Sequence, residues 1–179
     1  MDNIYLPKIV KITEIREQSS TVKLFRLAPG FSFNPGQFVL AGQIGYGEAP
    51  FGPLSPPDEK KYIEIAVRKT GAITNYFHSL KEGDKITLRG PYGNGFPLDF
   101  IEGKDVVMVT GGCGIPPIAS LIEYIIKNRE KFGNIYLIYG AKTPEELLLK
   151  DKMKEWEKSN NKIITTIDKP PVGWTGPVG

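Results

Sequence analysis

A glycine-rich turn between an apolar run and a helical pattern is the strongest chemical signal in the sequence. The turn reads Thr110-Gly111-Gly112-Cys113-Gly114-Ile115-Pro116. Glycines let the backbone come close to a ligand, and the helix that follows presents unpaired N–H groups and the positive end of its dipole. A pyrophosphate needs both features, so the pattern predicts a phosphate site. A tight strand-to-helix turn without a ligand is the alternative.

A second turn of this kind is Gly71-Ala72-Ile73-Thr74-Asn75. Gly71 permits a sharp bend, Thr74 can cap a short helix, and the exposed amides there could bind a second pair of phosphates. The neighbouring Arg68 and Lys69 would balance the negative charge. An ordinary capped helix is the alternative, and from this segment alone it is the preferred interpretation.

Two single residues could be given chemical roles on their type alone. His78 is the only histidine, and no cluster of metal-ligating residues accompanies it, so we expect a surface residue and no metal site. Cys113 could be a reactive thiol because it would lie at a helix N-terminus, although a small residue in a tight glycine turn is the preferred interpretation. No nucleophile elbow is present, which argues against a hydrolase.

The composition is that of an ordinary globular protein. Of the 179 residues, 40% are apolar and 24% are charged, and the net charge is +3. Basic and acidic residues are interspersed, which gives no support for nucleic-acid binding. No stretch approaches the roughly 20 apolar residues of a membrane span, and the first residues lack a secretory pattern. One cysteine excludes an internal disulfide and an iron–sulfur cluster held by this chain alone, so we expect a cytoplasmic protein.

The first half of the chain, residues 1–98, alternates as antiparallel β structure does. Apolar residues recur at every second position in two segments, and three earlier runs are rich in β-branched or aromatic residues. In chain order the five segments are Lys8–Ile15, Thr21–Leu27, Gln37–Ala41, Tyr62–Lys69 and Lys85–Arg89. Five or six short strands separated by Gly and Pro predict an antiparallel β-barrel of the Greek-key type, because closure removes exposed sheet edges.

The rhythm changes near residue 100, and residues 99–179 alternate strands with helices. A compact apolar run at Asp105–Thr110 predicts a strand buried on both faces. Pro116–Asn128 has apolar residues at helical spacing, and Ile135–Tyr139 and Ile163–Ile167 predict two further strands. This alternation predicts a doubly wound parallel α/β sheet.

A second helix in this half is expected to begin at Thr143. Thr143, Pro144 and Glu146 stand in the order of a capping residue, a proline at the first helical position and a capping-box glutamate. Three strands and two helices are fewer than a doubly wound nucleotide-binding fold usually has. Either the barrel caps a short, partial sheet or the chain is a piece of a longer protein, and we favour the piece.

Several short motifs follow one another along the chain in a recognisable order. They are Asn34-Pro35-Gly36-Gln37-Phe38-Val39, Gly71–Asn75, Gly83-Asp84 with Arg89-Gly90-Pro91-Tyr92-Gly93-Asn94-Gly95-Phe96, Gly111–Pro116 and Tyr139-Gly140-Ala141. Together they resemble the ferredoxin–NADP reductase superfamily over nearly the whole chain. The resemblance is to the electron-transfer subunits of this superfamily: those of anaerobic sulfite reductase, of sulfhydrogenase (its gamma subunit) and of dihydroorotate dehydrogenase.

The resemblance implies a barrel that binds FAD and a following domain that binds NAD(H) or NADP(H). In this family the nicotinamide delivers a hydride to the flavin, and the flavin passes single electrons to an iron–sulfur or catalytic partner subunit. The family therefore implies a flavin-dependent oxidoreductase that works in a hetero-oligomer. The cofactors perform the redox chemistry and the protein positions them, so no catalytic acid or nucleophile is expected.

The cofactor contacts of the family can be carried onto residues of this chain. Those expected to contact FAD are Pro50, Phe51, Gly52, Ala66, Val67, Arg68, Gly71, Ile73, Thr74 and Asn75. Those expected to hold the nicotinamide nucleotide are Gly111, Gly112, Cys113, Gly114, Pro116, Tyr139, Gly140 and Ala141.

One departure from the family pattern concerns the flavin. The family usually has Arg-x-Tyr-Ser or Arg-Pro-x-Ser where this chain reads Ala49-Pro50-Phe51-Gly52, so the arginine and the serine are both missing. Phe51 can still pack on a ring face. Ser55 could replace the missing serine through a shifted loop.

Two further expectations concern the end of the chain. Relatives continue beyond the position of Gly179, often with a cysteine-rich tail, so a [2Fe–2S] cluster is expected only in a C-terminal segment outside this chain. Asp168 ends the third predicted strand, where an acid disfavours a 2′-phosphate, and Lys169 could offset it. We therefore lean to NAD.

The leading hypothesis is an FAD-dependent NAD(P)H oxidoreductase subunit that passes electrons to a partner. The rival is a non-catalytic partner-binding subunit that has lost tight FAD binding, which Ala49 and Gly52 suggest. The two phosphate-type turns favour the enzyme. A third interpretation, a phosphate-binding α/β domain fused to an unrelated barrel, does not explain the order of the motifs.

Overall fold

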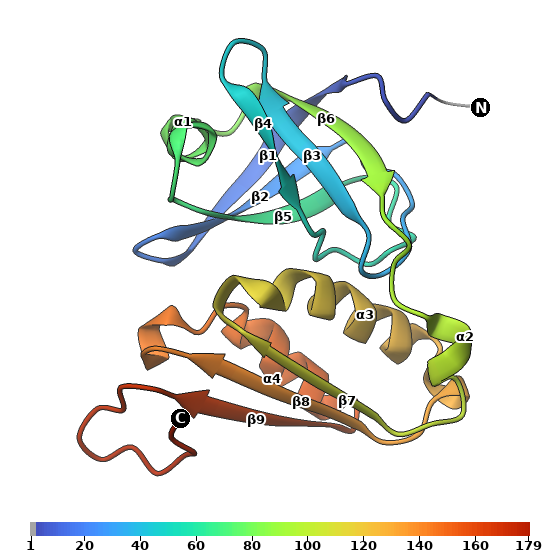
Figure 1. Cartoon of the computed structure of the whole chain (residues 1–179), viewed down its shortest axis with the longest axis vertical. Coiled ribbons are helices and arrows are strands. Elements are labelled where there is room, and N and C mark those ends of the chain that lie inside the picture. The colour runs from blue at the N-terminus through green and yellow to red at the C-terminus, as the bar shows by residue number, and fades with distance from the viewer. Residues whose placement is uncertain (1–2) are drawn as a thin grey trace.

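The computed structural model describes residues 3–179 and divides them between an antiparallel and a parallel sheet (Figure 1). The antiparallel sheet has six strands in the spatial order β4-β3-β6-β1-β2-β5. Its strands are β1 (Lys8–Ser19), β2 (Val22–Ala28), β3 (Phe38–Gln43), β4 (Gly47–Phe51), β5 (Ile63–Arg68) and β6 (Lys85–Tyr92). The predicted fold class, a barrel-like antiparallel sheet followed by a parallel α/β sheet, is confirmed.

The two outer strands of the antiparallel sheet, β4 and β5, come together just beyond the end of β4. Pro53 forms an antiparallel bridge with Ile65, and the N–H of Leu54 donates to the carbonyl of Glu64 at 2.9 Å. Buried apolar side chains fill the interior that the sheet encloses: Val10, Ile12, Phe25, Leu27, Phe33, Val39, Ala41, Ile63, Ile65, Val67, Phe77, Ile86 and Leu88. Curling the sheet around this core protects its edges.

Two elements complete the barrel. β4 was not among the expected strands because Gly47–Phe51 has no apolar alternation and contains Pro50, which only an outer strand tolerates. Helix α1 (Ala72–Ser79) follows β5 and inserts Phe77 into the core. The Phe77 ring meets those of Phe25 and Phe51 edge to face, with centroids 5.7 and 5.9 Å away. α1 is therefore anchored by the core beneath it.

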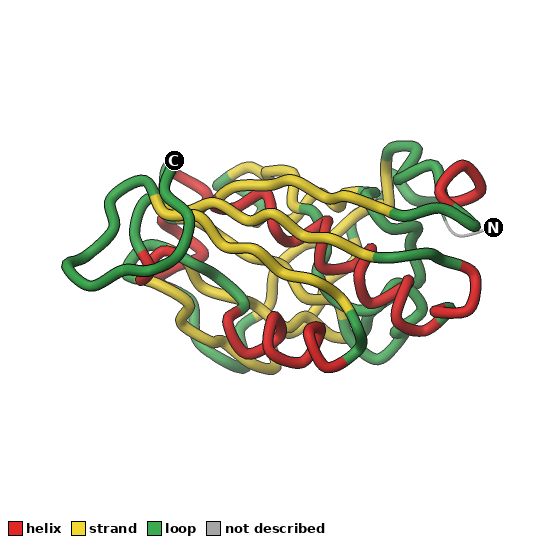
Figure 2. Tube along the Cα trace, turned by 90° about the horizontal axis from the view of Figure 1, so that it is seen from below, coloured by secondary structure: helices red, strands yellow, loops and turns green. Residues whose placement is uncertain are grey.

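The second sheet is parallel, in the order β7-β8-β9, as the strand–helix alternation predicted. Its strands are β7 (Val106–Gly111), β8 (Ile135–Ala141) and β9 (Asn161–Ile167). The helices are α2 (Leu98–Ile101), α3 (Ile115–Lys127) and α4 (Lys150–Lys158), with short 3₁₀ turns at Gly112–Gly114, Arg129–Lys131 and Pro144–Glu146. Beyond β9 the chain forms a loop that projects from one end of the sheet (Figure 2).

The expectation that β7 is buried on both faces was wrong. Val106 and Met108 are buried, whereas Val107 and Val109 are 61% and 70% exposed. Each step β7 to β8 to β9 moves in the same direction across the sheet, so right-handed crossovers place α3 and α4 on the same face. The opposite face of β7 has no helix over it among the described residues.

The expectation that the second helix begins at Thr143 was also wrong. Pro144–Glu146 makes one 3₁₀ turn, and α4 begins only at Lys150. The intervening Leu147, Leu148 and Leu149 are all buried. Three consecutive residues cannot share one face of an α-helix, so burying all three requires a non-helical backbone.

The two sheets share one hydrophobic cluster. Val22 and Leu24 of β2 and Leu54 after β4 belong to the same buried cluster as the apolar residues of α3, α4 and the parallel sheet. A polar contact also joins the two layers, since the side chain of Gln18 in β1 accepts a hydrogen bond from the N–H of Leu149, just before α4, at 2.8 Å. The barrel and the α/β layer therefore pack directly on each other.

A buried carboxylate lies beside this junction. Glu64 of β5 alternates with the core residues Ile63 and Ile65 and is only 2% exposed. It pairs with Arg16 and with Arg26, whose Nη2 lies 3.1 Å from its Oε1. A charge so buried is tolerated because two guanidinium groups compensate it.

Within residues 3–179, no helix has the length and apolar character that crossing a bilayer would need.

Candidate functional site

A cleft of about 290 Å³ opens where the barrel meets the α/β layer. Three segments line it: β4 with the residue after it, the end of β5 with the start of α1, and the glycine turn with the start of α3. The lining residues are Ala49, Pro50, Phe51, Gly52, Ala66, Arg68, Thr70, Thr74, Cys113, Pro116 and Pro117. The cleft thus brings together residues that lie far apart in the sequence, most of which were predicted as cofactor contacts.

The start of α1 forms one side of the cleft. Gly71 is the N-cap and Thr74 is the third helical residue, so Thr74 does not cap the helix in the predicted position. Its hydroxyl instead accepts hydrogen bonds from the N–H groups of Thr70 at 2.9 Å and Gly71 at 2.8 Å. This fixes the turn and leaves the first helical amides, at Ala72 and Ile73, without intrahelical acceptors. Such amides are suited to bind an anion.

Arg68 is the charged residue of the cleft. Its Nε is one of two buried side-chain polar atoms that lack a hydrogen-bond partner within residues 3–179. Its Nη2 would lie 3.3 Å from a Cβ placed on Gly112, so the guanidinium reaches from β5 to the glycine turn. A buried donor without a partner is costly unless a ligand satisfies it, and the guanidinium matches a phosphate. An anionic group bound in the cleft would satisfy this donor.

The residues around β5 alternate between cleft and core. Ala66 and Arg68 face the cleft, whereas Val67 between them is fully buried in the barrel core. The Val67 side chain therefore does not reach the cleft, because successive strand residues point to opposite faces. The Val67 carbonyl lies 2.9 Å from Nε2 of His78, which is half-buried on α1.

The segment after β4 shows how closely the two layers approach. A Cβ on Gly52 would lie 3.0 Å from Cδ of Pro117, so glycine favours the close contact with α3. Ser55 does not lie in the cleft. It is fully buried, and its hydroxyl accepts a hydrogen bond from the N–H of Glu64 at 3.3 Å. The expectation that Ser55 replaces the missing serine therefore does not fit its position.

The glycine turn forms the third side of the cleft. Gly111 ends β7, Gly112–Gly114 make a 3₁₀ turn, and α3 begins at Ile115 with a proline in its first turn. Gly112 has a φ of +50°, which favours glycine. A Cβ on Gly114 would lie 2.5 Å from Oγ1 of Thr110, so the turn also requires a residue without a side chain there.

Tyr139 supports the turn from beneath. It is fully buried, and its hydroxyl donates to the carbonyl of Gly112 at 3.0 Å and accepts from the N–H of Leu148 at 3.1 Å. Burial raises the pKa of Tyr139 to about 12. Its side chain therefore lies under the turn rather than on its surface.

The other predicted nucleotide contacts follow the carboxyl edge of the parallel sheet. Gly111, Gly140 and Thr166 are register partners across β7, β8 and β9. Ala141 follows at the same edge, and its carbonyl accepts from the N–H of Asp168 at 3.0 Å. Asp168 is exposed there. These residues extend the site along the sheet edge, the usual ligand position in open α/β sheets.

Thr70, Pro117 and Ala49 line the cleft although they were not predicted as contacts. Each is the immediate neighbour of a predicted contact segment, so a wider window around the motifs would have found them.

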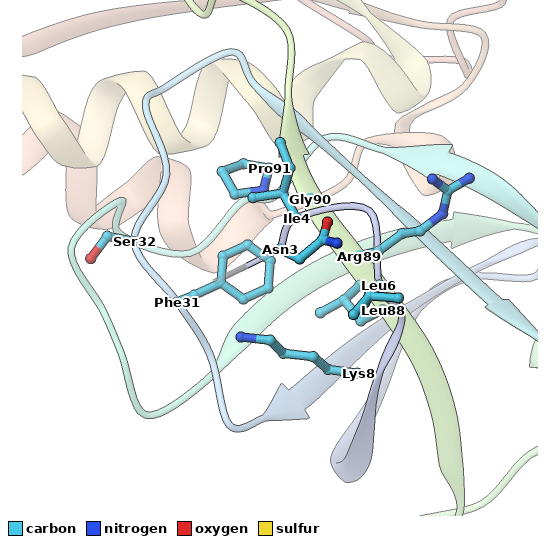
Figure 3. Close-up of a pocket in the computed structure, with 10 residues that line it drawn as sticks. All are labelled: Asn3, Ile4, Leu6, Lys8, Phe31, Ser32, Leu88, Arg89, Gly90 and Pro91. Atoms are coloured by element: carbon cyan, nitrogen blue, oxygen red, sulfur yellow. The ribbon is translucent and has the colours of Figure 1, made fainter. Parts of the chain in front are cut away.

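A second hollow, of about 130 Å³, lies between the N-terminal segment, β6 and residues 31–32 (Figure 3). It contains none of the predicted contacts.

The two halves of the chain match two protein-family models. Residues 9–96 match the oxidoreductase FAD-binding domain, and residues 108–179 match the oxidoreductase NAD-binding domain. The chain therefore carries an oxidoreductase FAD-binding domain followed by an oxidoreductase NAD-binding domain.

Similar individual proteins describe the resemblance more specifically than the two family models do. Sulfhydrogenase 2 subunit gamma of Pyrococcus furiosus is 38% identical over 168 residues, which cover 90% of this chain and 58% of the relative. A probable dihydroorotate dehydrogenase B (NAD(+)) electron transfer subunit of the same organism is 40% identical over 167 residues, covering 93% and 61%. The chain is homologous to these subunits and, in these matches, spans about 60% of their length.

Solved structures with the same fold are more distant in sequence. A ferredoxin NADP⁺ reductase from Neisseria gonorrhoeae with bound FAD and NADP has a TM-score of 0.84 at 23% identity, covering 97% of this chain and 72% of that one. The cytochrome b5 reductase domain of Ulva prolifera nitrate reductase has a TM-score of 0.81 at 20% identity, covering 99% and 79%. These likenesses establish the fold.

Proposed function

We propose that this chain binds FAD in the cleft and a nicotinamide nucleotide at the glycine turn, and passes electrons from NAD(P)H through FAD to a partner subunit. The observation that carries the proposal is the buried Arg68 Nε, which lacks a partner and lies between two turns suited to phosphate groups. FAD would supply the chemistry that accepts a hydride and releases single electrons.

The residues of the barrel would bind and orient FAD. The amides of Ala72 and Ile73 would hold the pyrophosphate, and the Thr74 hydroxyl keeps that turn in shape. Phe51 would pack on the flavin ring, and the Pro116–Pro117 pair would wall the cleft off from water. Arg68 would supply from β5 the positive charge that the family usually places where this chain has Ala49.

The residues of the α/β layer would bind the nicotinamide nucleotide. Its phosphates would lie on the glycine turn, and its ribose would lie near the carboxyl edge where Asp168 is exposed. An acid at that position disfavours a 2′-phosphate, so we propose NAD(H) as the preferred coenzyme. Lys142 and Lys169 are neighbours of Asp168, because the N–H of Lys169 donates to the carbonyl of Lys142 at 2.8 Å.

The wider setting of the function is also a proposal. The relatives are named as subunits, which supports an iron–sulfur or catalytic partner in a cytoplasmic hetero-oligomer. We propose a domain boundary near residue 98, with residues 1–98 binding FAD and residues 99–179 binding the nicotinamide nucleotide. The rival function, a partner-binding subunit without FAD, is not favoured, because it leaves the buried Arg68 donor without a purpose.

The test is a visible absorption spectrum of the purified chain, followed by anaerobic titration with NADH and then NADPH. We expect the two flavin bands after incubation with FAD, and bleaching at lower concentrations of NADH than of NADPH. A chain that retains no flavin after reconstitution would overturn the proposal. Bound flavin that neither nucleotide bleaches would overturn its nicotinamide part alone.

A further inference from the structure

The only histidine of the sequence, His78, has no role in the proposed function so far. It lies in α1, is half-buried, and its Nε2 is 2.9 Å from the carbonyl oxygen of Val67 in β5. A backbone carbonyl oxygen only accepts hydrogen bonds, so this contact places the ring proton on Nε2. Within residues 3–179, no other side chain of α1 forms a hydrogen bond with a strand residue.

The carbonyl that His78 contacts belongs to the peptide group joining Val67 to Arg68. The atoms of a peptide group lie in one plane, so a hydrogen bond to this carbonyl restrains the backbone from which the Arg68 side chain departs. Ala66 and Arg68, on either side of Val67, both line the cleft, whereas His78 does not. The histidine therefore acts on the cleft wall from behind it.

The helix that carries His78 also carries the second set of donors. The amides of Ala72 and Ile73 at the start of α1 are free of intrahelical acceptors. Phe77, next to His78, holds α1 on the barrel core through apolar contacts, which are not directional. A hydrogen bond depends on direction as well as distance, so His78 fixes how α1 lies against β5.

The relative placement of α1 and β5 decides whether one anion can reach both sets of donors. The Arg68 guanidinium comes from β5 and the amides come from α1, and only Lys69-Thr70-Gly71 separate the two elements. Donors that already converge before the ligand arrives bind it more tightly, because no ordering is left to be done on binding. A contact that locks the two elements together should therefore strengthen binding without touching the ligand.

We propose that His78 is a positioning residue for the pyrophosphate of FAD. Its Nε2–H holds the Val67–Arg68 peptide against α1, so that the Arg68 guanidinium and the α1 amides face the same anion. The inference rests on the proposed function, because it takes FAD to occupy the cleft. His78 contributes a hydrogen-bond donor and does not contact the cofactor.

The test measures the dissociation constant of the full chain for FAD by flavin fluorescence, with thermal melting of the FAD-free protein as the check on folding. His78→Leu removes the donor and is expected to weaken FAD binding about fivefold, the scale of one net hydrogen bond. His78→Gln keeps an N–H donor of similar reach and is expected to restore the wild-type affinity. Ser79→Ala is the matched control, because the Ser79 hydroxyl donates to the carbonyl of Tyr76, within α1, at 2.7 Å.

A double-mutant cycle with Arg68→Met separates positioning from general support of the fold. If His78 acts through Arg68, His78→Leu should cost little further affinity once Arg68 is replaced. His78→Asn, whose amide is too short to reach the carbonyl, takes its place in the cycle if His78→Leu does not fold.

Each outcome of these measurements decides the inference. A loss in His78→Leu that His78→Gln restores and that disappears in the Arg68→Met background supports it. Losses that add in full, unchanged FAD affinity in His78→Leu, or an equal loss in Ser79→Ala would overturn it and leave the proposed function standing. A wild-type chain that binds no FAD after reconstitution would overturn both proposals together.

Discussion

The two turns that face the cleft are held in shape in different ways. At the start of α1 the support is local, since the Thr74 hydroxyl bonds to amides three and four residues before it. At the glycine turn the support comes from far along the chain. The hydroxyl of Tyr139 donates to the carbonyl of Gly112, and the same hydroxyl accepts from the N–H of Leu148. The barrel turn is thus encoded in its own sequence, whereas the glycine turn depends on the fold around it.

Because of this difference, the two turns depend on different parts of the fold being ordered. The α1 turn can form as soon as its short segment is ordered, and its hydrogen bonds should survive small shifts of the rest of the molecule. The glycine turn needs β8 and the buried leucine run in place before its backbone is fixed. Changes far from the glycine turn should therefore reach the nucleotide site sooner than the flavin site.

Removing the charge between the two turns should have the largest effect. Arg68→Met is expected to weaken FAD binding about 10- to 100-fold, the scale of lost charge-assisted hydrogen bonds. The FAD-free protein should melt no lower than wild type, because the change removes a buried donor that has no partner there. Fluorescence titration and thermal melting check the two statements. Lys69→Met is the control, and an equal loss of FAD affinity in it would contradict the role given to Arg68.

Removing the long-range support of the glycine turn should have the next largest effect. Tyr139→Phe leaves the carbonyl of Gly112 and the N–H of Leu148 without their partner, at an expected cost of about 2–3 kcal/mol in unfolding free energy. Urea unfolding measures this cost. Affinity for NADH should fall more than affinity for FAD. If FAD binding fell further than NADH binding, the assignment of the two turns would be reversed.

The same hydroxyl should make stability depend on alkaline pH. Burial raises the pKa of Tyr139 to about 12, so the folded state retains a proton that the unfolded chain loses near pH 10. The stabilisation is complete below pH 10 and is lost as pH rises from about 10 to 12, by on the order of 2 kcal/mol. Unfolding free energies measured across this range test it. Tyr139→Phe should have a shallower slope, and an identical slope would exclude Tyr139 as the cause.

Breaking the local support should have the smallest effect. Thr74→Val removes the acceptor for two amides of the α1 turn, at an expected cost of about 1 kcal/mol, because water can reach the amides of an exposed turn. FAD affinity should fall only a few-fold and NADH affinity should not change. Thr74→Ser keeps the hydroxyl and should behave as wild type. A loss of stability larger than that of Tyr139→Phe would contradict the ranking of the two turns.

Local patterns predicted the elements that depend on local chemistry. Five of the six barrel strands, the three parallel strands and α3 followed from periodicity and from Gly and Pro. β4 escaped prediction because it is specified by pairing with β3, which no alternation in Gly47–Phe51 announces. The start of α4 was misplaced because burial of three consecutive leucines overrides a good capping pattern.

The site was predicted less completely than the fold. Glycine turns and Arg68 followed from motifs, since their residue types are themselves the signal. The placement of Val67 away from the cleft could not be predicted, because one residue of register decides whether a strand side chain faces core or ligand. Ser55 lies in the irregular segment between β4 and β5, whose path no local pattern specifies. The role of Tyr139 beneath the turn depends on β8 lying beside β7, a contact between residues about thirty positions apart.

The apolar cluster that joins β2 and Leu54 to α3 and α4 has a consequence for cooperativity. Unfolding either layer alone would expose Val22, Leu24 and the facing residues of the other layer to water, and each such side chain contributes on the order of 1.5–3 kcal/mol when buried. The barrel and the α/β layer should therefore melt in one calorimetric transition. A ligand that binds only one layer then raises the melting temperature of both.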